Sequence, residues 1–264
     1  MRWWTAALAV LVGANMTRAA VRTEVIEYKH GDVVLEGYLA YDDSATGKRP
    51  GVLVCHEWVG HNPYVRKRAE QLAALGYVAF ALDMYGKGVQ AKSRQDAVAK
   101  SSVFKKDRAL MRARAGVGLD VLRKHPRVDA KRLAAIGYCF GGTCALELAR
   151  GGADLAGVVS FHGDLTTPAP ADARNIKGKV LALHGADDPF VPPRDVAAFE
   201  KEMRDAGVDW QLVKYGGAVH SFTNPGAGRD VKSGAAYDAR ADARSWQAMR
   251  DFFAELFPEK RATP

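Results

Sequence analysis

Two hydrophobic patterns alternate along the chain and predict its elements. Short, almost continuous apolar stretches are typical of strands buried on both faces, and they lie at 51–57, 77–83, 132–138, 155–163, 179–185 and 210–217. Apolar residues at the spacing of amphipathic helices occur at 64–76, 104–123, 140–150, 194–207 and 236–257. This alternation indicates an α/β fold, with a mostly parallel sheet and helices on both of its faces.

The segment before the first of these strands has a different pattern. Residues 21–43 alternate apolar and polar positions around a Gly-Asp turn, which predicts an antiparallel N-terminal hairpin. Between Met84 and Phe104 the periodicity lapses, and a connection of that length is either functional or partly helical. No linker rich in proline, glycine or serine divides the chain, so we expect residues 21–264 to form one domain.

The first 20 residues have the pattern of a secretory signal peptide. Arg2 precedes an apolar run at 3–12, and small and polar residues then lead to a candidate cleavage site near Ala19 or Ala20. The run is too short to span a bilayer, although a buried N-terminal helix or an uncleaved anchor would share its composition. We therefore expect a periplasmic or secreted protein whose mature chain has no membrane-inserted segment. The first residue of the mature chain tests this expectation.

The composition is that of a soluble globular protein, with 48% hydrophobic and 26% charged residues and a formal net charge of +8. Much of the positive excess lies at 92–114, where only Asp96 and Asp107 oppose the basic residues. These are Lys92, Arg94, Lys100, Lys105, Lys106, Arg108, Arg112 and Arg114. The stretch has neither the aromatic platforms nor the motif of a nucleic-acid site, so we expect no nucleic-acid partner. It is either a solvated helix face or an attraction for an anionic substrate.

The three cysteines are too few for a disulfide framework, and their odd number leaves at least one of Cys55, Cys139 and Cys144 unpaired within the chain. Cys139 is the candidate for a reactive thiol. It lies between Gly137 and Gly141, after a predicted strand and before a predicted helix, which is the setting of a nucleophile elbow. Glycine is needed because side chains beside the nucleophile would strike neighbouring elements. The alternative is a small hydrophobic residue under a glycine-rich turn.

An acid and a histidine follow Cys139 in the chain order that this arrangement requires. Asp187 and Asp188 come directly after the predicted strand 179–185, and His220 lies in a glycine-rich loop after the next strand. Of the two carboxylates we favour Asp188, and we expect Asp187 to cap the turn. In this hypothesis His220 takes the proton of the thiol and Asp188 orients the imidazole. Such catalysis needs no metal and no organic cofactor.

The segment HEWVGH at 56–61 is similar to the zinc-binding sequence H-E-x-x-H. The histidines of that motif lie four residues apart on a helix. His56 and His61 are five apart, and the segment leaves a predicted strand. We therefore expect no metal site there.

Four separated motifs, HEWVGHN, GYCFGG, DDPFVPP and GGAVHSFTN, resemble those of the dienelactone hydrolase family of α/β hydrolases, in the same order over residues 24–257. The resemblance implies an α/β-hydrolase fold and the cleavage of a small ester or lactone through an acyl-enzyme. It assigns the triad to Cys139, Asp188 and His220. It also implies that Glu57 contacts the resting thiol, and that the backbone N–H groups of Trp58 and Phe140 bind the oxyanion.

The resemblance defines the family more closely than the substrate. Members that cleave dienelactone hold its carboxylate with two arginines, and this chain has Lys87 as the nearest cation at one position and Asn224 at the other. Neither replaces a bidentate arginine. We therefore do not expect dienelactone itself as the substrate, although a small ester or lactone remains the expected partner.

Two alternatives stay open. Phe222, together with Trp58 and Phe140, could line an apolar groove for an acyl chain, as in a thioesterase or general carboxylesterase. A non-catalytic binding or redox-sensing protein is the alternative from another class, although a complete acid and base beside the thiol would have no role in binding alone. In each case we expect a monomer.

Overall fold

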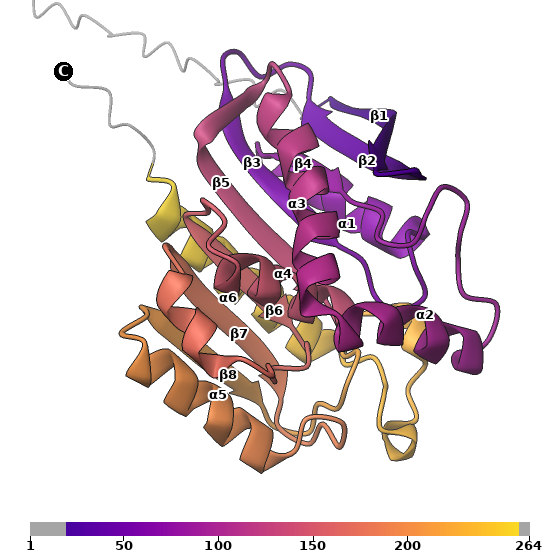
Figure 1. Cartoon of the computed structure of the whole chain (residues 1–264), viewed down its shortest axis with the longest axis vertical. Coiled ribbons are helices and arrows are strands. Elements are labelled where there is room, and N and C mark those ends of the chain that lie inside the picture. The colour runs from indigo at the N-terminus through magenta and orange to yellow at the C-terminus, as the bar shows by residue number, and fades with distance from the viewer. Residues whose placement is uncertain (1–19, 259–264) are drawn as a thin grey trace, which may run out of the picture.

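The computed structural model describes residues 20–258, and within them eight strands form one sheet (Figure 1). The strands are β1 (Val21–His30), β2 (Val33–Asp42), β3 (Arg49–Cys55), β4 (Val78–Ala81), β5 (Val128–Tyr138), β6 (Gly157–Phe161), β7 (Lys179–Gly185) and β8 (Trp210–Tyr215). Their order across the sheet is β1-β2-β4-β3-β5-β6-β7-β8. Strands β3 to β8 run parallel, whereas β1 with β2, and β2 with β4, pair antiparallel. The mostly parallel sheet with an antiparallel N-terminal hairpin is confirmed.

The predicted signal segment lies outside the described residues, apart from Ala20, and stays a prediction.

Six α-helices lie within the described residues. They are α1 (Pro63–Ala74), α2 (Arg94–Lys106), α3 (Arg108–Lys124), α4 (Phe140–Arg150), α5 (Pro193–Asp205) and α6 (Ala239–Leu256). Three short 3₁₀ segments lie in the loops, η1 (Pro170–Asn175), η2 (Pro225–Ala227) and η3 (Val231–Ser233). Apolar residues of α3, α4 and α5 belong to the core on one face of the sheet, and those of α1 and α6 belong to the core on the other. Helices therefore cover both faces, as the hydrophobic pattern predicts.

Burial on both faces explains the continuous apolar runs of the strands. Along β3, Leu53 and Cys55 belong to one core, and Val52 and Val54 belong to the other. All four side chains are fully buried. Successive strand residues point to opposite faces, so every position must be apolar when helices cover both. Each large aliphatic side chain buried in this way contributes about 1.5–3 kcal/mol to the driving force for folding.

The predicted helix at 104–123 is two helices. They are separated at Asp107, whose backbone leaves the helical conformation at φ −118° and ψ 90°. Its carboxylate accepts a hydrogen bond from the N–H of Leu110 at 2.8 Å, which caps the start of α3. Phe104 therefore belongs to α2 and not to the apolar stripe of α3. The aperiodic stretch before it is partly helical, since α2 begins at Arg94.

The carboxyl ends of the parallel strands bring the candidate residues to one edge of the sheet. Glu57 follows β3, Cys139 follows β5, and Asp188 and His220 follow β7 and β8. Open α/β sheets gather their sites at this edge, because the connecting loops meet there.

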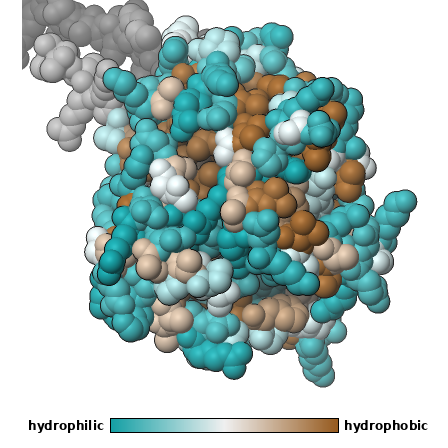
Figure 2. Space-filling model, viewed as in Figure 1, coloured by the Kyte–Doolittle hydropathy of each residue, from teal (hydrophilic) through white to brown (hydrophobic). Residues whose placement is uncertain are grey.

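The surface is polar over most of the face in Figure 2, and apolar side chains show through it in small groups. No helix within residues 20–258 combines the length and the apolar character that crossing a membrane requires.

Candidate active site

Cys139 lies in the tight turn between β5 and α4. Its backbone has φ 54° and ψ −119°, a conformation that costs a non-glycine residue about 1–3 kcal/mol unless its surroundings enforce it. Glycines on both sides make room for the turn. A Cβ on Gly137 would lie 1.9 Å from the carbonyl oxygen of Gly141, and one on Gly141 would lie 2.1 Å from that of Cys55. The turn therefore has the geometry of the predicted elbow.

Hydrogen bonds link the thiol of Cys139 to the imidazole of His220, and that imidazole to the carboxylate of Asp188. The Sγ atom of Cys139 lies 3.0 Å from Nε2 of His220, and Nδ1 of the same ring lies 2.8 Å from Oδ2 of Asp188. The side chain of Asp188 is fully buried, and its Oδ1 accepts the N–H of Phe190 at 2.8 Å. The structure thus brings together the three residues that the chain order predicts.

Asp187 has a separate set of contacts. It is exposed, and its carboxylate accepts the N–H of Gly217 at 3.0 Å. This bond ties the loop after β7 to the loop after β8. The geometry pairs His220 with Asp188 and leaves Asp187 as a turn residue.

The neighbours of the His220 imidazole favour its protonated form. Burial alone would lower the pKa of His220, but the neighbouring sulfur of Cys139 and the carboxylate of Asp188 raise that pKa to about 10. Cys139 is also the N-cap residue of α4, so the partial positive charge of the helix N-terminus lies next to the sulfur. An imidazolium and a helix N-terminus each stabilise a thiolate.

Glu57 and Asn224 form a second polar pair in the same cavity. The amide Nδ2 of Asn224 donates to Oε2 of Glu57 at 2.5 Å, and its Oδ1 accepts the N–H of Gly226 at 2.8 Å. Burial raises the pKa of the Glu57 carboxyl, although the hydrogen bond from Asn224 opposes the shift. Within residues 20–258 the side chain of Glu57 is hydrogen-bonded to Asn224, and the sulfur of Cys139 is hydrogen-bonded to His220. Glu57 lines the same cavity as Cys139, and its expected contact with the resting thiol stays a prediction.

The backbone N–H groups of Trp58 and Phe140 are available as donors. Both residues line the cavity that contains Cys139, and within residues 20–258 neither N–H has a hydrogen-bond acceptor. Phe140 is the first residue of α4, and the initial N–H groups of a helix have no acceptor inside it. These are two donors of the kind that an oxyanion needs.

One cavity of about 420 Å³ contains these groups, a volume that suits a small ligand. The predicted site residues that line it are Glu57, Trp58, Cys139, Phe140, His220 and Asn224. Residues that line it without having been predicted for the site include Arg94, Lys105, Asp164, Phe190 and Ser221. Phe190 belongs to the motif DDPFVPP, so the sequence contained a signal for it. Arg94 and Lys105 reach the cavity only through the packing of α2, which no sequence motif indicates.

Two residues predicted to bind substrate lie outside the cavity, and the prediction for them is corrected. Lys87 pairs with Glu27 on β1 at 2.5 Å, and both side chains are about half exposed. The loop after β4 lies beside the hairpin because β4 pairs with β2, and the N–H of Lys87 donates to the carbonyl of Val34. Phe222 is fully buried, with its ring against those of His162 and Tyr215. It packs beneath the site.

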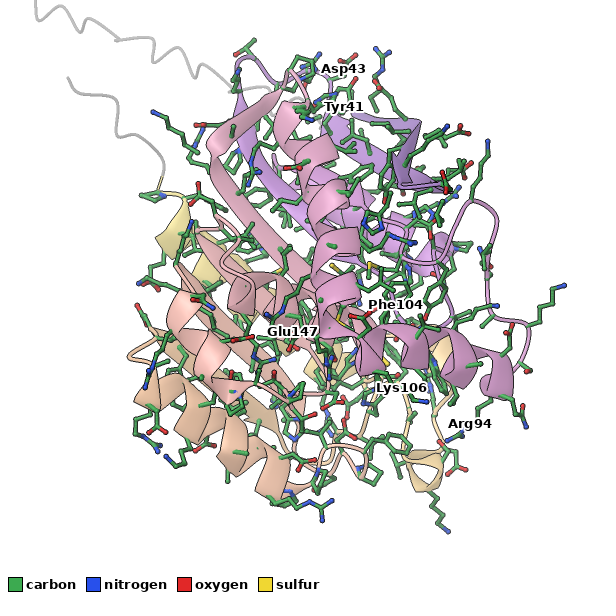
Figure 3. The ribbon with its side chains drawn as sticks, in the orientation of Figure 1. Tyr41, Asp43, Arg94, Phe104, Lys106 and Glu147 are labelled. Atoms are coloured by element: carbon green, nitrogen blue, oxygen red, sulfur yellow. The ribbon has the colours of Figure 1, made fainter. Side chains whose placement is uncertain are left out.

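The basic stretch divides into a surface part and a cavity part. Arg94 and Lys106 lie toward opposite ends of α2 (Figure 3). Lys100 pairs with Asp96 on the outside of the same helix at 2.9 Å. Arg94 and Lys105 are the members of the stretch that line the cavity. The basic stretch therefore contributes to the cavity wall as well as to the outer surface of α2.

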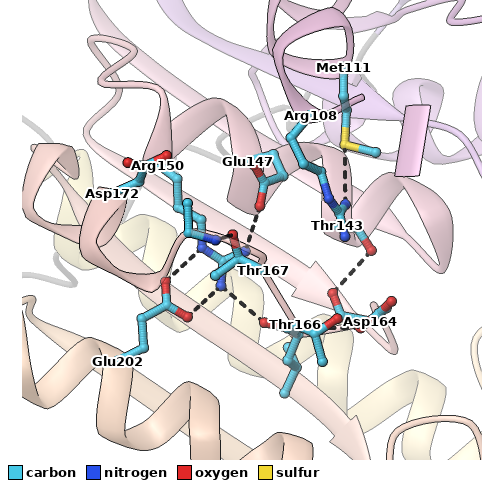
Figure 4. Close-up of polar contacts among 12 residues, drawn as sticks. Arg108, Met111, Thr143, Glu147, Arg150, Asp164, Thr166, Thr167, Asp172 and Glu202 are labelled. Atoms are coloured by element: carbon cyan, nitrogen blue, oxygen red, sulfur yellow. Dashed lines mark hydrogen bonds and ion pairs between the residues drawn. The ribbon is translucent and has the colours of Figure 1, made fainter. Parts of the chain in front are cut away.

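A buried charge network surrounds Arg150 (Figure 4). Arg150 at the end of α4 is fully buried and pairs with Glu147 at 3.1 Å and with both carboxylate oxygens of Glu202 at 2.7 Å. Its guanidinium also donates to the carbonyl of Leu165 at 3.0 Å, next to Asp164. Removing one partner of such a group leaves a buried charge uncompensated. The network therefore links α4 and α5 to the loop that carries Asp164.

The HEWVGH segment contains a histidine whose ring is already satisfied. Nδ1 of His56 donates to the carbonyl of Glu57 at 2.6 Å, and Nε2 accepts the N–H of Met84 at 3.1 Å. Within residues 20–258 no three potential ligands come together as a metal site.

A mostly parallel sheet that presents a nucleophile turn, an acid and a histidine in this order at its strand ends defines the α/β-hydrolase fold. The sequence model of the dienelactone hydrolase family matches residues 35–257, and the chain belongs to this family. Among solved structures, the protein titled m3DLH is 45% identical with a TM-score of 0.87, over 90% of this chain and 99% of its own. A dienelactone hydrolase-like promiscuous phosphotriesterase from metagenomic libraries is 43% identical with a TM-score of 0.86, over the same shares. A Yersinia pestis protein, provisionally named a carboxymethylenebutenolidase, is 28% identical over 236 residues, which cover 84% of each chain.

The two adjacent aspartates provide a matched test of the site. Asp188→Asn is expected to lower ester turnover by about 10²- to 10³-fold, because the imidazole loses the carboxylate that orients it and stabilises its charged form. Asp187→Asn should leave the rate and the thermal midpoint nearly unchanged, because its amide oxygen can still accept the N–H of Gly217. Both variants are compared by kcat and thermal midpoint. A large rate loss in the Asp187 variant alone would transfer the role to that residue.

Proposed function

We propose that this member of the dienelactone hydrolase family cleaves a small carboxylic ester or lactone through an acyl-enzyme on Cys139. The observation that carries the proposal is the continuous contact from the sulfur through His220 to a buried Asp188, in a cavity with two unpaired N–H donors. Each of these groups has a use in acyl transfer. The lactone-cleaving name of the Yersinia pestis relative agrees with this substrate class.

In the first half-reaction the ionised sulfur of Cys139 attacks the carbonyl carbon, and a C–S bond forms. The carbonyl oxygen becomes an oxyanion, which the N–H groups of Trp58 and Phe140 stabilise. The C–O bond to the leaving alcohol then breaks, and the Nε2 proton of His220 passes to the departing oxygen. The result is a thioester on Cys139 and a free alcohol, or the hydroxyl end of an opened lactone.

In the second half-reaction neutral His220 removes a proton from water, and the oxygen attacks the thioester carbon. The same two N–H groups hold the second oxyanion. The C–S bond breaks, the sulfur leaves as a thiolate, and the carboxylic acid is released. Asp188 keeps the ring oriented and offsets its positive charge in both halves.

The alternatives agree less well with the site. An acyl-chain substrate, as in a thioesterase, needs an apolar groove, but Phe222 is buried in the core and Arg94 and Asp164 bring charge to the wall. A binding or redox-sensing role would give no use to the hydrogen bond between His220 and Asp188. A small, polar ester or lactone therefore suits the cavity best.

The nucleophile is tested by two substitutions at one position. Cys139→Ala is expected to abolish turnover of p-nitrophenyl acetate and of a simple lactone, with a thermal midpoint near that of the wild type. Cys139→Ser should also be strongly impaired, because a hydroxyl ionises far less readily than a thiol beside the same imidazole. Steady-state rates and circular dichroism of the three proteins provide the measurement. An alanine variant with a near wild-type rate would point to another nucleophile.

Positively charged side chains in the cavity wall indicate which substrate charge the site favours. The guanidinium carbon of Arg94 lies 5.9 Å from the centre of the Trp58 ring. Lys105, the other cation that lines the cavity, has a carboxylate oxygen of Asp164 at 3.7 Å. A guanidinium placed on an aromatic ring keeps its N–H groups free for a carboxylate. We infer that Arg94 favours esters that carry a negative charge.

Arg94→Gln is expected to lower kcat/KM for an anionic ester, mono-p-nitrophenyl succinate, by about tenfold or more, because one charge-assisted contact is lost. The value for the neutral p-nitrophenyl butyrate should change little. Lys92→Gln is the matched control, since Lys92 belongs to the same basic stretch, is exposed and does not line the cavity. Equal changes for both esters would exclude charge recognition by Arg94.

A further inference from the structure

We propose that His162 is a positioning residue that holds the backbone of the nucleophile and borders the catalytic imidazole, a role that rests on the function proposed above. His162 directly follows β6 and is fully buried. It belongs to neither the triad nor the four motifs of the family resemblance. Its contacts nevertheless reach both Cys139 and His220.

The backbone of His162 is held in an unfavourable conformation. Within residues 20–258, three non-glycine residues have a positive φ, namely Cys139 at 54°, His162 at 41° and Ser221 at 57°. Cys139 is the proposed nucleophile, and Ser221 directly follows His220, the proposed base. Conformations of this kind persist where the surroundings enforce them, and they cluster at functional sites. The N–H of His162 donates to the carbonyl of Leu183 on β7 at 2.8 Å, which helps to hold it.

The ring of His162 accepts a hydrogen bond from the backbone of the nucleophile. The N–H of Cys139 has two acceptors, Nδ1 of His162 at 3.1 Å and the carbonyl oxygen of Phe161 at 3.0 Å. Because an N–H group can only donate, Nδ1 carries no proton in this contact. The ring proton then lies on Nε2, which is 2.7 Å from Oγ1 of Thr223.

Thr223 connects this ring to a buried cation. Its Oγ1 lies 2.6 Å from the phenol oxygen of Tyr64, and its carbonyl oxygen accepts from Nη2 of Arg68 at 2.7 Å. Arg68 is held in turn by Asp242 at 2.6 Å. Tyr64 and Arg68 lie on α1 and Asp242 lies on α6, so helices on the face of the sheet opposite α4 hold the threonine whose hydroxyl contacts Nε2 of His162.

The same ring borders the catalytic imidazole. The centres of the His162 and His220 rings are 5.3 Å apart, and their planes meet at 66°. Burial lowers the pKa of His162 well below its usual value, and the charges of His220 and Arg68 add to this effect. The neutral ring that the contact with Cys139 requires is thus the form that the surroundings favour. His162 therefore sets the relative position of the nucleophile and its base.

Asparagine and glutamine each imitate a different part of this side chain. In His162→Asn the amide oxygen takes the place of Nδ1 and can accept the N–H of Cys139. In His162→Gln the amide extends toward Thr223 and leaves that N–H with one acceptor. We expect the Gln variant to lose about 10- to 100-fold in kcat with little change in KM, since a small misplacement of a reacting atom has effects of this size. The Asn variant should keep most of the activity, and alkylation of Cys139 by iodoacetamide should follow the same order.

Tyr28→Phe is the matched control, because it removes two buried hydrogen bonds with the backbone of Asp83 outside the cavity. It should lower the thermal midpoint and leave kcat and the alkylation rate unchanged. Equal kcat in the Asn and Gln variants, or a loss of kcat that follows the thermal midpoint across all three variants, overturns the proposal.

A measurement on the unaltered protein decides the case if the Gln variant does not fold. The imidazole ¹⁵N shifts of His162 should show an unprotonated Nδ1 and a protonated Nε2, and a protonated Nδ1 would overturn the proposal. Absence of ester turnover in the wild type would contradict the proposed function instead. The alkylation rates would still test the role of His162, because they need no substrate.

Discussion

The backbone of Cys139 must keep a positive φ where β5 turns into α4, and much of the surrounding structure maintains that constraint. Gly137 and Gly141 leave the space that the turn needs. Every residue of α4 is buried, so the helix cannot move away from the sheet without losing its packing. Arg150 anchors the far end of α4 to Glu202 on α5. A buried ion pair is weak evidence for stability, and we interpret this pair as holding α4 in position.

The same constraint determines the charges of the site. The turn places the sulfur at the first turn of α4, where the helix N-terminus and the imidazole of His220 both stabilise a negative charge. Asp188 lies on the other side of the ring, with its side chain fully buried and its Oδ2 2.8 Å from Nδ1 of His220. Glu57 would oppose an ionised sulfur if it were charged, but burial raises its pKa toward the neutral form.

Features that depend on chain order could be predicted from the sequence. The glycines of the elbow are local, and Asp188 and His220 follow consecutive strands of a parallel sheet, whose carboxyl ends meet at one edge. Features that depend on tertiary packing could not. The pairing of β4 with β2 places Lys87 beside the hairpin. Ser221 has a positive φ, and the next residue, Phe222, packs into the core. The helical periodicity also continues through Asp107, because a capping residue can interrupt a helix without changing the apolar pattern. Arg94 lies between Met84 and Phe104, where the sequence has no regular apolar periodicity.

Cys139 should carry the acyl group between the two half-reactions, and this is open to direct measurement. The protein is quenched in acid during turnover of p-nitrophenyl acetate and analysed by mass spectrometry. We predict an added acetyl group whose fragment ions place it on Cys139 and not on the nearby Cys144, and which disappears when the substrate is exhausted. Turnover without this group, or with the acetyl group on another residue, would contradict the assignment of Cys139 as the nucleophile.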